Sequence, residues 1–370
     1  MYMKRILLLT QTRKPTSGWG RIADELSKRL IARGYEPIVA TEDESSLNCP
    51  PYLLKNTLAS FKSTVRASFK IRKLAKSCDL VHALDAYPYG IIGAAATIGL
   101  RKPLAITAIG TYAIMPLESR KLRPFMTWAY RRTNIILPIV NFTTQELQKR
   151  VTRLPRMERV LLGVDASQFT PVSVNKRATE QPYFLSVGAL KKRRGCHVAL
   201  PALAIVKEKH PNVQYILVGD NSDQKYVDFL QSEIKKYHLE NNVQIKGFMD
   251  PVAVRQLYEE CTAFLLIPQN SPTNFAGFHL VYLEANAMGK PVIGSEGYGS
   301  EETVINGKNG FLVSPHDPAA LAVVLDKLLS DPVLIEQLAK GSREMAESLS
   351  WDKTVDAYCR YYEELLVSKV

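Results

Sequence analysis

The chain has 370 residues, enough for two domains, and its 46% hydrophobic and 23% charged residues are ordinary for a soluble globular protein. Its start lacks the pattern of a secretory signal, its apolar run at 91–100 is too short to span a membrane, and its five scattered cysteines form no C-x-x-C pair, which favours free thiols in the cytoplasm. Residues 1–171 hold 27 Lys and Arg against 12 Asp and Glu, so the positive net charge of +12 comes from the first half of the chain. Such a basic half indicates an anionic partner, which could be a membrane surface, nucleic acid or an acidic substrate. The alternative is that these charges are simply solvated.

The first half alternates predicted strands and helices, which is the pattern of a parallel, doubly wound sheet. Residues 4–10 form an apolar strand, a glycine-bearing turn follows at 16–20, and residues 21–34 show helical spacing that ends at a glycine. A glycine- and alanine-rich helix is expected before residue 103. Further strands are predicted at 36–41, 80–84, 103–109, 134–139 and 159–163.

A polar segment with two prolines, at 165–182, indicates a linker, and the alternation restarts after it. Helices are expected at 197–209 and 222–238. Strands are predicted at 183–188, 213–220, 243–248, 263–268, 291–295 and 310–314. The fold class is therefore α/β, with two doubly wound, Rossmann-like domains at 1–172 and 173–350 that face each other across a cleft. Ligands of such sheets bind at the carboxyl ends of the strands, so we expect the binding residues to lie at this cleft. Residues 351–370 form an amphipathic helix.

The stretch VGALKKRRGC places four cations, from Lys191 to Arg194, between a predicted strand and a predicted helix, with Gly188 before them and Gly195 after them. A strand-to-helix turn exposes backbone N–H groups, and the helix dipole favours negative charge there. Added Lys and Arg side chains make such a turn a candidate diphosphate site. The alternative is a solvated basic loop.

A second informative stretch is TNFAGFHLVYLEANAMGKPVI. In it a loop with Gly277 runs into a helix that contains Glu284, so the start of this helix is a second candidate anion site. Glu284 lies one turn further along, where it could accept hydrogen bonds from sugar hydroxyls. The alternative for Glu284 is a solvent-facing or capping carboxylate.

Taken in order, YFLSVGALKKRRG, VQYILVGD, VQIKGF, AFLLIP, GFHLVYLEANAMGKPVIGS, EETVINGKNGFLVSPHDPAAL and SWDKTVDAYCRYYEELL resemble the family 4 retaining glycosyltransferases of the two-Rossmann-domain (GT-B) type. SGWGRIADELSKRLIARGYEPIVAT and VLLGVDASQFTP fit the same family, so the resemblance covers essentially the whole chain. It implies a nucleotide-diphosphate-sugar donor bound by the C-terminal domain, an acceptor bound by the N-terminal domain, and sugar transfer with retention of configuration. It also implies that no metal or other cofactor is required and that the final helix crosses back onto the N-terminal domain.

By position, the resemblance also assigns donor-binding residues. Arg194 matches a diphosphate cation of the family, Glu284 matches the glutamate that typically binds ribose hydroxyls, and Phe248 lies where such enzymes often contact the base. The full set of donor-binding candidates is Gly18, Gly20, Gly188, Lys192, Arg193, Arg194, Phe248, Gly277, Phe278, His279, Leu280 and Glu284. No catalytic residue is assigned.

The chain departs from the family pattern at four positions. Ala189 stands where an arginine is usual, Ala276 replaces the first glutamate of the E-x7-E motif, Ile109 replaces a histidine, and His279 stands in place of a glycine. Two hypotheses therefore remain. One is an active transferase of a hexose-type sugar onto a lipid-linked, polysaccharide or glycan acceptor; the other is a weak or inactive homologue that binds nucleotide sugars or serves as a partner subunit.

Two basic segments of the first half, 55–76 and 118–134, interleave apolar and aromatic residues with Lys and Arg. This composition suits peripheral association with the anionic inner face of a membrane, although both helices could instead pack their apolar faces on the domain. Nucleic acid is not expected, because the cations surround no motif that binds it. His82, Thr111 and Tyr112, which follow or end predicted strands, are the candidate acceptor-binding residues.

Overall fold

The structure is a computed structural model that describes residues 3–57, 60–169, 181–270, 275 and 277–367. It divides into two compact units, one made of residues 1–162 with 351–370 and the other of residues 163–350. The division falls before the predicted boundary at 172, because Val164 donates its backbone N–H to the carbonyl of Leu349, 2.9 Å away, and packs in an apolar cluster with Leu283 and Ala346. Part of the predicted linker, residues 170–180, lies outside the described residues.

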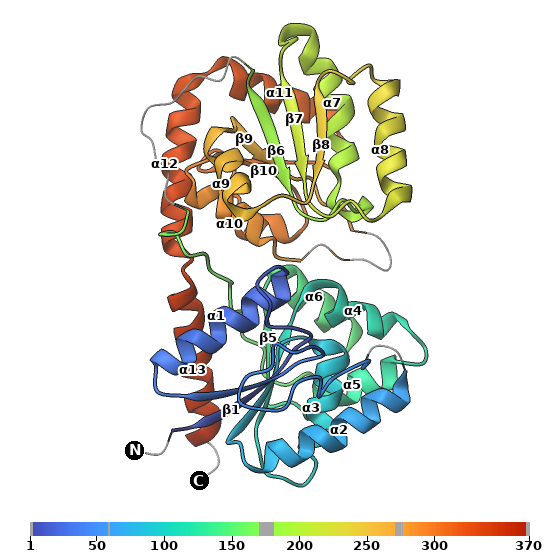
Figure 1. Cartoon of the computed structure of the whole chain (residues 1–370), viewed down its shortest axis with the longest axis vertical. Helices are drawn as coiled ribbons and strands as arrows, with labels where there is room; N and C mark the ends of the chain where they lie inside the picture. Colours follow the sequence, from blue (N-terminus) through green and yellow to red (C-terminus); the bar gives the residue numbers. More distant parts are fainter. Residues whose placement is uncertain (1–2, 58–59, 170–180, 271–274, 276, 368–370) are drawn as a thin grey trace. The chain divides into compact units, whose positions relative to one another are not determined.

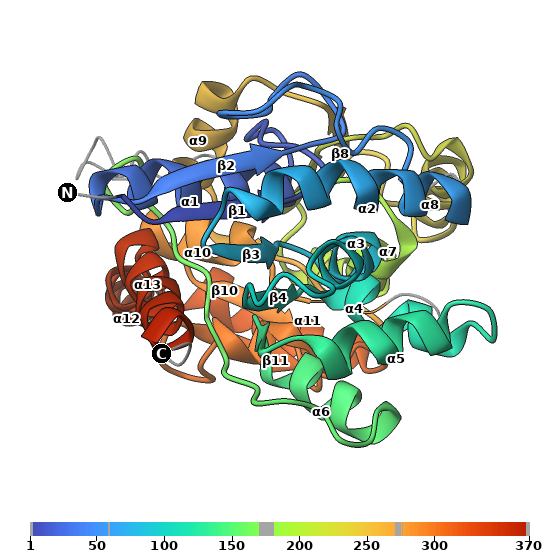
Figure 2. The ribbon, with the colours of Figure 1, turned by 90° about the horizontal axis from the view of Figure 1, so that it is seen from below.

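The first unit contains a parallel five-stranded sheet in the order β2-β1-β3-β4-β5. Figure 2 shows β2, β1, β3 and β4 in this succession, with α13 to one side of them and α2, α3 and α5 to the other. The elements of the first unit are β1 (Arg5–Leu9), α1 (Gly18–Ala32), β2 (Glu36–Ala40), α2 (Phe61–Lys76), β3 (Leu80–Ala83), η1 (Ala86–Gly90), α3 (Ile91–Ala96), β4 (Leu104–Ala108), α4 (Gly110–Glu118), α5 (Arg123–Arg132), β5 (Ile135–Pro138), α6 (Asn141–Arg150) and α13 (Trp351–Val367).

Helix α13 is part of the first unit because its apolar face completes the core beside α1. Val355, Tyr358 and Tyr362 are buried there with residues of β1, β3 and β5. At the edge of this contact Arg33 of α1 pairs with Asp352 and Asp356 at 3.0 and 2.7 Å. Exposed pairs of this kind contribute little, so apolar burial is what holds the helix.

The second unit contains a parallel six-stranded sheet in the order β11-β10-β9-β6-β7-β8. Figure 1 labels β9, β6, β7 and β8 in this succession. This is the dinucleotide-fold order, with its switch point between β6 and β9. Its elements are β6 (Tyr183–Val187), η2 (Lys192–Arg194), α7 (Cys196–Lys209), β7 (Gln214–Val218), α8 (Gln224–Lys236), β8 (Val243–Gly247), α9 (Pro251–Glu260), β9 (Ala263–Leu265), α10 (Leu280–Ala287), β10 (Val292–Ser295), η3 (Gly299–Glu302), β11 (Gly310–Val313), α11 (Pro318–Ser330) and α12 (Pro332–Ser348).

Two local predictions were wrong. Residues 159–163 form no strand; the segment follows the edge of β5 through single bonds, such as the one from the Val160 N–H to the Pro138 carbonyl at 2.9 Å. Only the beginning of the predicted glycine-bearing turn at 16–20 is a turn, at Thr16. Gly18 and Gly20 already belong to the first turn of α1, because Ser17 caps the helix by accepting a hydrogen bond from the Gly20 N–H at 3.1 Å. Among the described residues, no helix is long and apolar enough to cross a membrane.

Candidate functional site

Three glycines terminate neighbouring strands at the carboxyl edge of the second sheet. Gly188, Gly219 and Gly247 follow or end β6, β7 and β8, and all have positive φ angles of 133°, 143° and 64°. The Gly188 N–H donates a hydrogen bond to the Val218 carbonyl oxygen, with N···O 2.8 Å, and the Gly219 N–H donates one to the Gly247 carbonyl oxygen, with N···O 2.7 Å. Side chains are strained at such angles, so glycine lets the three chain segments turn while they remain in contact.

The cationic turn after β6 is fixed against the loop that follows β9. Gly195 ends the turn in the left-handed region, and a Cβ there would lie 1.6 Å from the Ile267 carbonyl oxygen. The Gln269 N–H donates to the Arg193 carbonyl at 2.9 Å. Because β6 and β9 flank the switch point, both loops lie where this fold binds its ligands.

Arg194 is the central side chain of this turn. Its guanidinium lies against Gly188, so close that a Cβ on Gly188 would be 2.6 Å from Nη1. Within the described part of the chain, the buried Nε and Nη1 atoms have no hydrogen-bond partner. Burial lowers the pKa of Arg194, and the neighbouring charge of Arg193 lowers it further. A buried cationic donor without a partner is costly, and an anion in contact with it would remove that cost.

The segment that leads into α10 is the second wall of the site. Gly277 packs its carbonyl against Gly299, where a Cβ would lie 2.3 Å from that oxygen. Phe278 is half-buried, while His279 is the buried N-cap residue of α10 and its side chain forms no capping bond. Leu280 begins the helix. Ala276, where the resemblance expects a glutamate, lies outside the described residues.

Glu284 lies one turn into α10 and is only 5% exposed. Its Oε2 accepts a hydrogen bond from the Tyr258 hydroxyl at 3.0 Å. Tyr258 and Tyr282 also lie near Arg194, so the two residues on which the sequence interpretation rests belong to one cluster inside the second unit. The solvent-facing alternative does not apply to Glu284, because its side chain is buried.

The other predicted donor residues lie around this cluster. Lys192 is exposed and Arg193 half-buried in η2, and Phe248, directly after β8, is 76% exposed. An exposed aromatic ring beside the glycine row is free to stack on a flat ligand. Ala189 is half-buried next to Gly188 and offers no charge.

In the first unit, the carboxyl ends of β1, β3 and β4 bring together a set of polar and aromatic groups. Gly20 allows the first turn of α1 to approach the Lys14 carbonyl, because a Cβ on Gly20 would lie only 1.7 Å from that oxygen. A Cβ on Gly18 would meet no atom within 4 Å. Trp19, between them, contacts Tyr112 with ring centroids 5.3 Å apart. Thr111 precedes Tyr112 in the first turn of α4 and is half-buried.

Asp85 is the buried acid of this edge. Its carboxyl group accepts a hydrogen bond from the Ala86 N–H at 2.7 Å. The Ile109 backbone N–H and the Trp19 indole N–H also lie near it, the latter without the geometry of a full hydrogen bond. Burial raises its pKa well above the ordinary value. Ile109, which stands where a histidine is usual, contributes a backbone donor but no side-chain cap to α4. Trp19 was missed from the sequence, although its position between two glycines was a signal.

His82 is not available to an acceptor. It is fully buried in β3, with Nδ1 2.6 Å from the Tyr362 hydroxyl and Nε2 2.8 Å from the Thr107 hydroxyl. Burial lowers its pKa to about 3, so the ring is neutral. The expectation that it binds an acceptor was wrong because α13, distant in sequence, supplies its partner.

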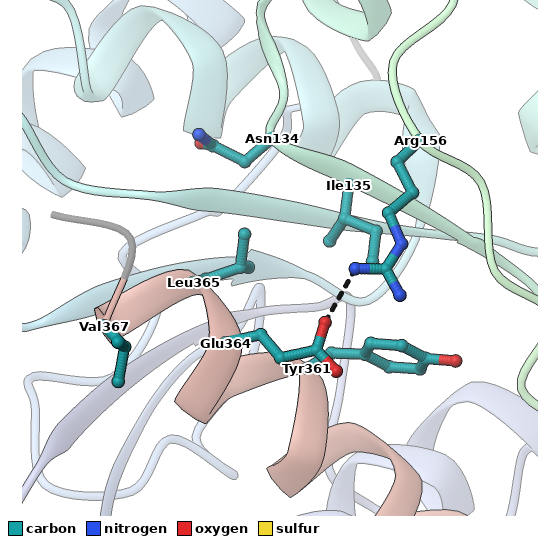
Figure 3. Close-up of a pocket in the computed structure, with 7 residues that line it drawn as sticks. All are labelled: Asn134, Ile135, Arg156, Tyr361, Glu364, Leu365 and Val367. Atoms are coloured by element: carbon teal, nitrogen blue, oxygen red, sulfur yellow. Dashed lines mark hydrogen bonds and ion pairs between the residues drawn. The ribbon is translucent and has the colours of Figure 1, made fainter.

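A cavity of about 370 Å³ lies in the first unit, away from this edge (Figure 3). It is lined by the amino end of β5 at Asn134 and Ile135 and by α13 at Tyr361 and Leu365. The charged groups at the cavity pair with each other, since Arg156 donates to Glu364 at 2.6 Å. Its charges are thus already neutralised, unlike the guanidinium at the switch point.

Comparison with known proteins identifies the class. Residues 16–168 match the family model Glycosyltransferase Family 4, and residues 170–345 match Glycosyl transferases group 1. The chain is 24% identical to glycogen synthase of Mycobacterium tuberculosis over 347 residues, 90% of this chain and 81% of that protein. It is 30% identical to the putative colanic acid biosynthesis glycosyltransferase WcaL of Escherichia coli over 220 residues, 59% of this chain and 53% of that one.

Among solved structures, Anabaena HepE in complex with UDP has a TM-score of 0.78 at 20% identity and covers 98% of this chain and 100% of its own. The fold and the two family matches define a glycosyltransferase. The chain belongs to the family 4 glycosyltransferases, with the GT-B fold.

Proposed function

We propose that this glycosyltransferase moves a hexose-type sugar from a nucleotide-diphosphate sugar to a lipid-linked or polysaccharide acceptor, with retention of configuration. The observation that carries the donor assignment is Arg194, whose buried Nε and Nη1 have no partner among the described residues at the switch point of a dinucleotide fold. Glu284, held by Tyr258, would accept the ribose hydroxyls. The complex of HepE with UDP supports a uridine nucleotide as the first ligand to test.

The chemistry we propose needs charge stabilisation more than a protein nucleophile. As the bond from the anomeric carbon to the phosphate oxygen breaks, its electron pair goes to the departing diphosphate. Arg194, with Lys192 and Arg193 beside it, would stabilise that charge together with the start of α10. The acceptor hydroxyl attacks from the same face and passes its proton to the departing phosphate oxygen.

Metal independence is part of this proposal. Cations of the protein would do the work of a divalent ion. Within the described ranges, no group of three or more His, Cys, Asp or Glu side chains is placed to hold a metal ion. Activity unaffected by EDTA would support metal independence, and restoration of a lost activity by Mg²⁺ or Mn²⁺ would contradict it.

We place the acceptor at the edge of the first unit where Trp19 and Tyr112 meet near Asp85. Aromatic rings with an apolar face suit the C–H face of a sugar ring. The name of the WcaL relative, which refers to colanic acid biosynthesis, supports a polysaccharide acceptor. Trp19→Ala should raise the KM for the acceptor and leave the affinity for the nucleotide unchanged.

Peripheral binding to an anionic membrane is the remaining part of the proposal. Helix α2 buries Ala67 and Ile71 on the domain but leaves Phe69 68% exposed among cations. Phe125 and Trp128 of α5 are 41% and 39% exposed. Exposed aromatic groups among Lys and Arg suit a lipid headgroup region. Co-sedimentation with phosphatidylserine vesicles at low salt should be lost on Phe69→Asp, and absence of any binding by the wild type would end this part of the proposal.

The test of the function is direct. Purified protein is incubated with UDP-, GDP- and ADP-sugars, and release of nucleoside diphosphate is measured with and without glycan or lipid-phosphate acceptors. Release with one donor class, abolished by Arg194→Met, supports an active transferase. Nucleotide binding without turnover across the panel would instead identify a binding homologue, and no binding at all would reject the donor site.

A further inference from the structure

His279 holds a position at which the family pattern has a glycine, and its imidazole is not accounted for by the fold. The residue is 7% exposed and precedes α10 in extended backbone, with φ of −111°. N-cap side chains normally accept a backbone N–H of the first turn, but this one does not. A buried polar ring at a helix start without a capping role needs another explanation.

The groups around the ring come from two elements. Tyr282 of α10 lies edge-on to it, with centroids 5.9 Å apart, but the Tyr282 hydroxyl is already bonded to the Leu266 carbonyl at 2.5 Å. Arg194 and Arg193 of η2 are the charged groups that face it, and with burial they lower the pKa of His279 well below 6.5. The ring is therefore neutral in the free protein, because a third positive charge here would be repelled.

Three buried polar atoms without partners thus lie in one neighbourhood of the described structure: Nε and Nη1 of Arg194 and Nε2 of His279. Buried polar atoms almost always have partners, and a group of three that share a neighbourhood indicates a missing ligand. A ligand that accepts two hydrogen bonds from the guanidinium would satisfy all three atoms if it also accepts one from the imidazole in the tautomer that carries its proton on Nε2. A phosphate group has enough acceptor oxygens for all three.

We propose that the His279 side chain is a donor-binding group of this enzyme, whose Nε2 donates a hydrogen bond to an oxygen of the diphosphate that Arg194 holds. This inference rests on the proposed function and adds to it a side-chain contact where the family pattern has a glycine. It falls at the same switch point as Ala189, where a usual arginine is absent. The imidazole adds a contact near a position at which the chain lacks a cation.

The contact has a signature that a structural histidine would lack. A bound diphosphate brings negative charge to the ring and offsets the two arginines, so the pKa of His279 rises in the complex. Binding then takes up protons, and affinity increases as the pH falls through the pKa of the bound state. The effect is read as a difference between proteins, because the nucleotide itself also titrates near pH 6.

The experiment is calorimetric titration of the wild type, His279→Ala, His279→Gln and Arg194→Met with UDP, GDP and ADP and with the matching nucleosides, in buffers of different ionisation enthalpy at pH 6 and 8. His279→Ala should weaken nucleoside diphosphate binding about tenfold and nucleoside binding not at all. His279→Gln, which keeps a donor near the position of Nε2, should recover part of the affinity but none of the proton uptake. His238→Gln, an exposed histidine after α8, is the matched control and should behave as the wild type.

The outcomes distinguish failure of the donor site from failure of the His279 contact. If the wild type binds none of the three nucleotides, the donor site itself is wrong. If it binds and Arg194→Met weakens binding, but His279→Ala keeps full affinity and the same proton uptake, the donor site holds and the role of His279 is rejected. Unfolding midpoints of both His279 variants check folding, and loss of nucleoside binding along with diphosphate binding would also overturn the proposed contact.

Discussion

The free protein should become more stable when Arg194 is replaced by an apolar side chain. Arg194→Met keeps the length of the stem and removes the guanidinium, whose Nε and Nη1 are buried without partners in the described structure. An unsatisfied buried donor costs about 1–3 kcal/mol, more when it is charged. Replacing it with an apolar group of similar size should therefore raise the free energy of unfolding of the second unit by about 1–3 kcal/mol.

The same substitution should weaken nucleotide binding, which is the role proposed for the unpaired guanidinium. Losing two charge-assisted hydrogen bonds to a diphosphate should weaken nucleotide binding about 100-fold. Thermal unfolding is followed with and without saturating nucleotide, and a unit of this size should shift by about 2–4 °C for each kcal/mol. Without ligand the midpoint of Arg194→Met should rise above that of the wild type; with ligand the order should reverse.

Lys191→Met is the matched control, because Lys191 is an exposed cation directly before the same turn. It should leave the free midpoint unchanged, since its charge is already in water. A free Arg194→Met protein that is less stable than the wild type would refute the reasoning, because it would mean that the guanidinium is satisfied within the fold.

Three further substitutions test neighbouring parts of the argument. Gly188→Ala should weaken nucleotide binding at least tenfold, as measured by calorimetric titration. The added Cβ would stand 2.6 Å from Nη1 of Arg194, and the φ of 133° is strained for alanine. Unchanged affinity would show that the guanidinium is not fixed against Gly188. Glu284→Gln should cost about tenfold in affinity for a ribonucleotide and little for its 2′,3′-dideoxy analogue, and equal losses for both would remove the ribose role. In the wild type, the pKa of His82 is about 3 in the folded state against an ordinary 6.5, so the unfolded state takes up a proton first as the pH falls. The free energy of unfolding of the wild type should therefore fall by about 1.4 kcal/mol per pH unit below pH 6.5. His82→Gln should remove this contribution and make the acid side of the stability profile flatter. An unchanged acid slope in urea titrations of this variant would contradict that assignment.

The periodicity of the sequence was sufficient to predict the class of fold. Strands that are buried on both faces appear in the sequence as short apolar runs, and the helices between them show the spacing of amphipathic helices. It was not sufficient for segments whose backbone bonds are irregular. Residues 159–163 have the composition of a strand, but they meet β5 only through isolated bonds. The division of the structure before Gly163 likewise has no local pattern, since the partners of Val164 in α10 and α12 are distant in sequence.

The candidate site is visible in the sequence where one local segment carries it and not where two segments meet. The turn with Arg194 and the helix with Glu284 each have a local pattern, and the structure gives the two residues shared neighbours, although their binding role stays a prediction. His82 was misassigned because its partners, Thr107 and Tyr362, come from β4 and α13. Trp19 and Tyr112 likewise gain their meaning only from a contact between α1 and α4 that neither segment encodes alone.

Three of the four departures from the family pattern lie among the described residues, and they do not fall evenly on the two units. Ala189 and His279 both lie at the switch point of the second unit, and there a lost cation is accompanied by a gained imidazole. Ile109 lies in the first unit, where its backbone N–H is near Asp85 but its side chain offers nothing polar. A phosphate can be held by whichever buried donors surround it, whereas a group that must reach the reacting sugar has no substitute on a neighbouring turn. Any deficit of this enzyme relative to its family should therefore appear in the rate of transfer before it appears in the affinity for the nucleotide.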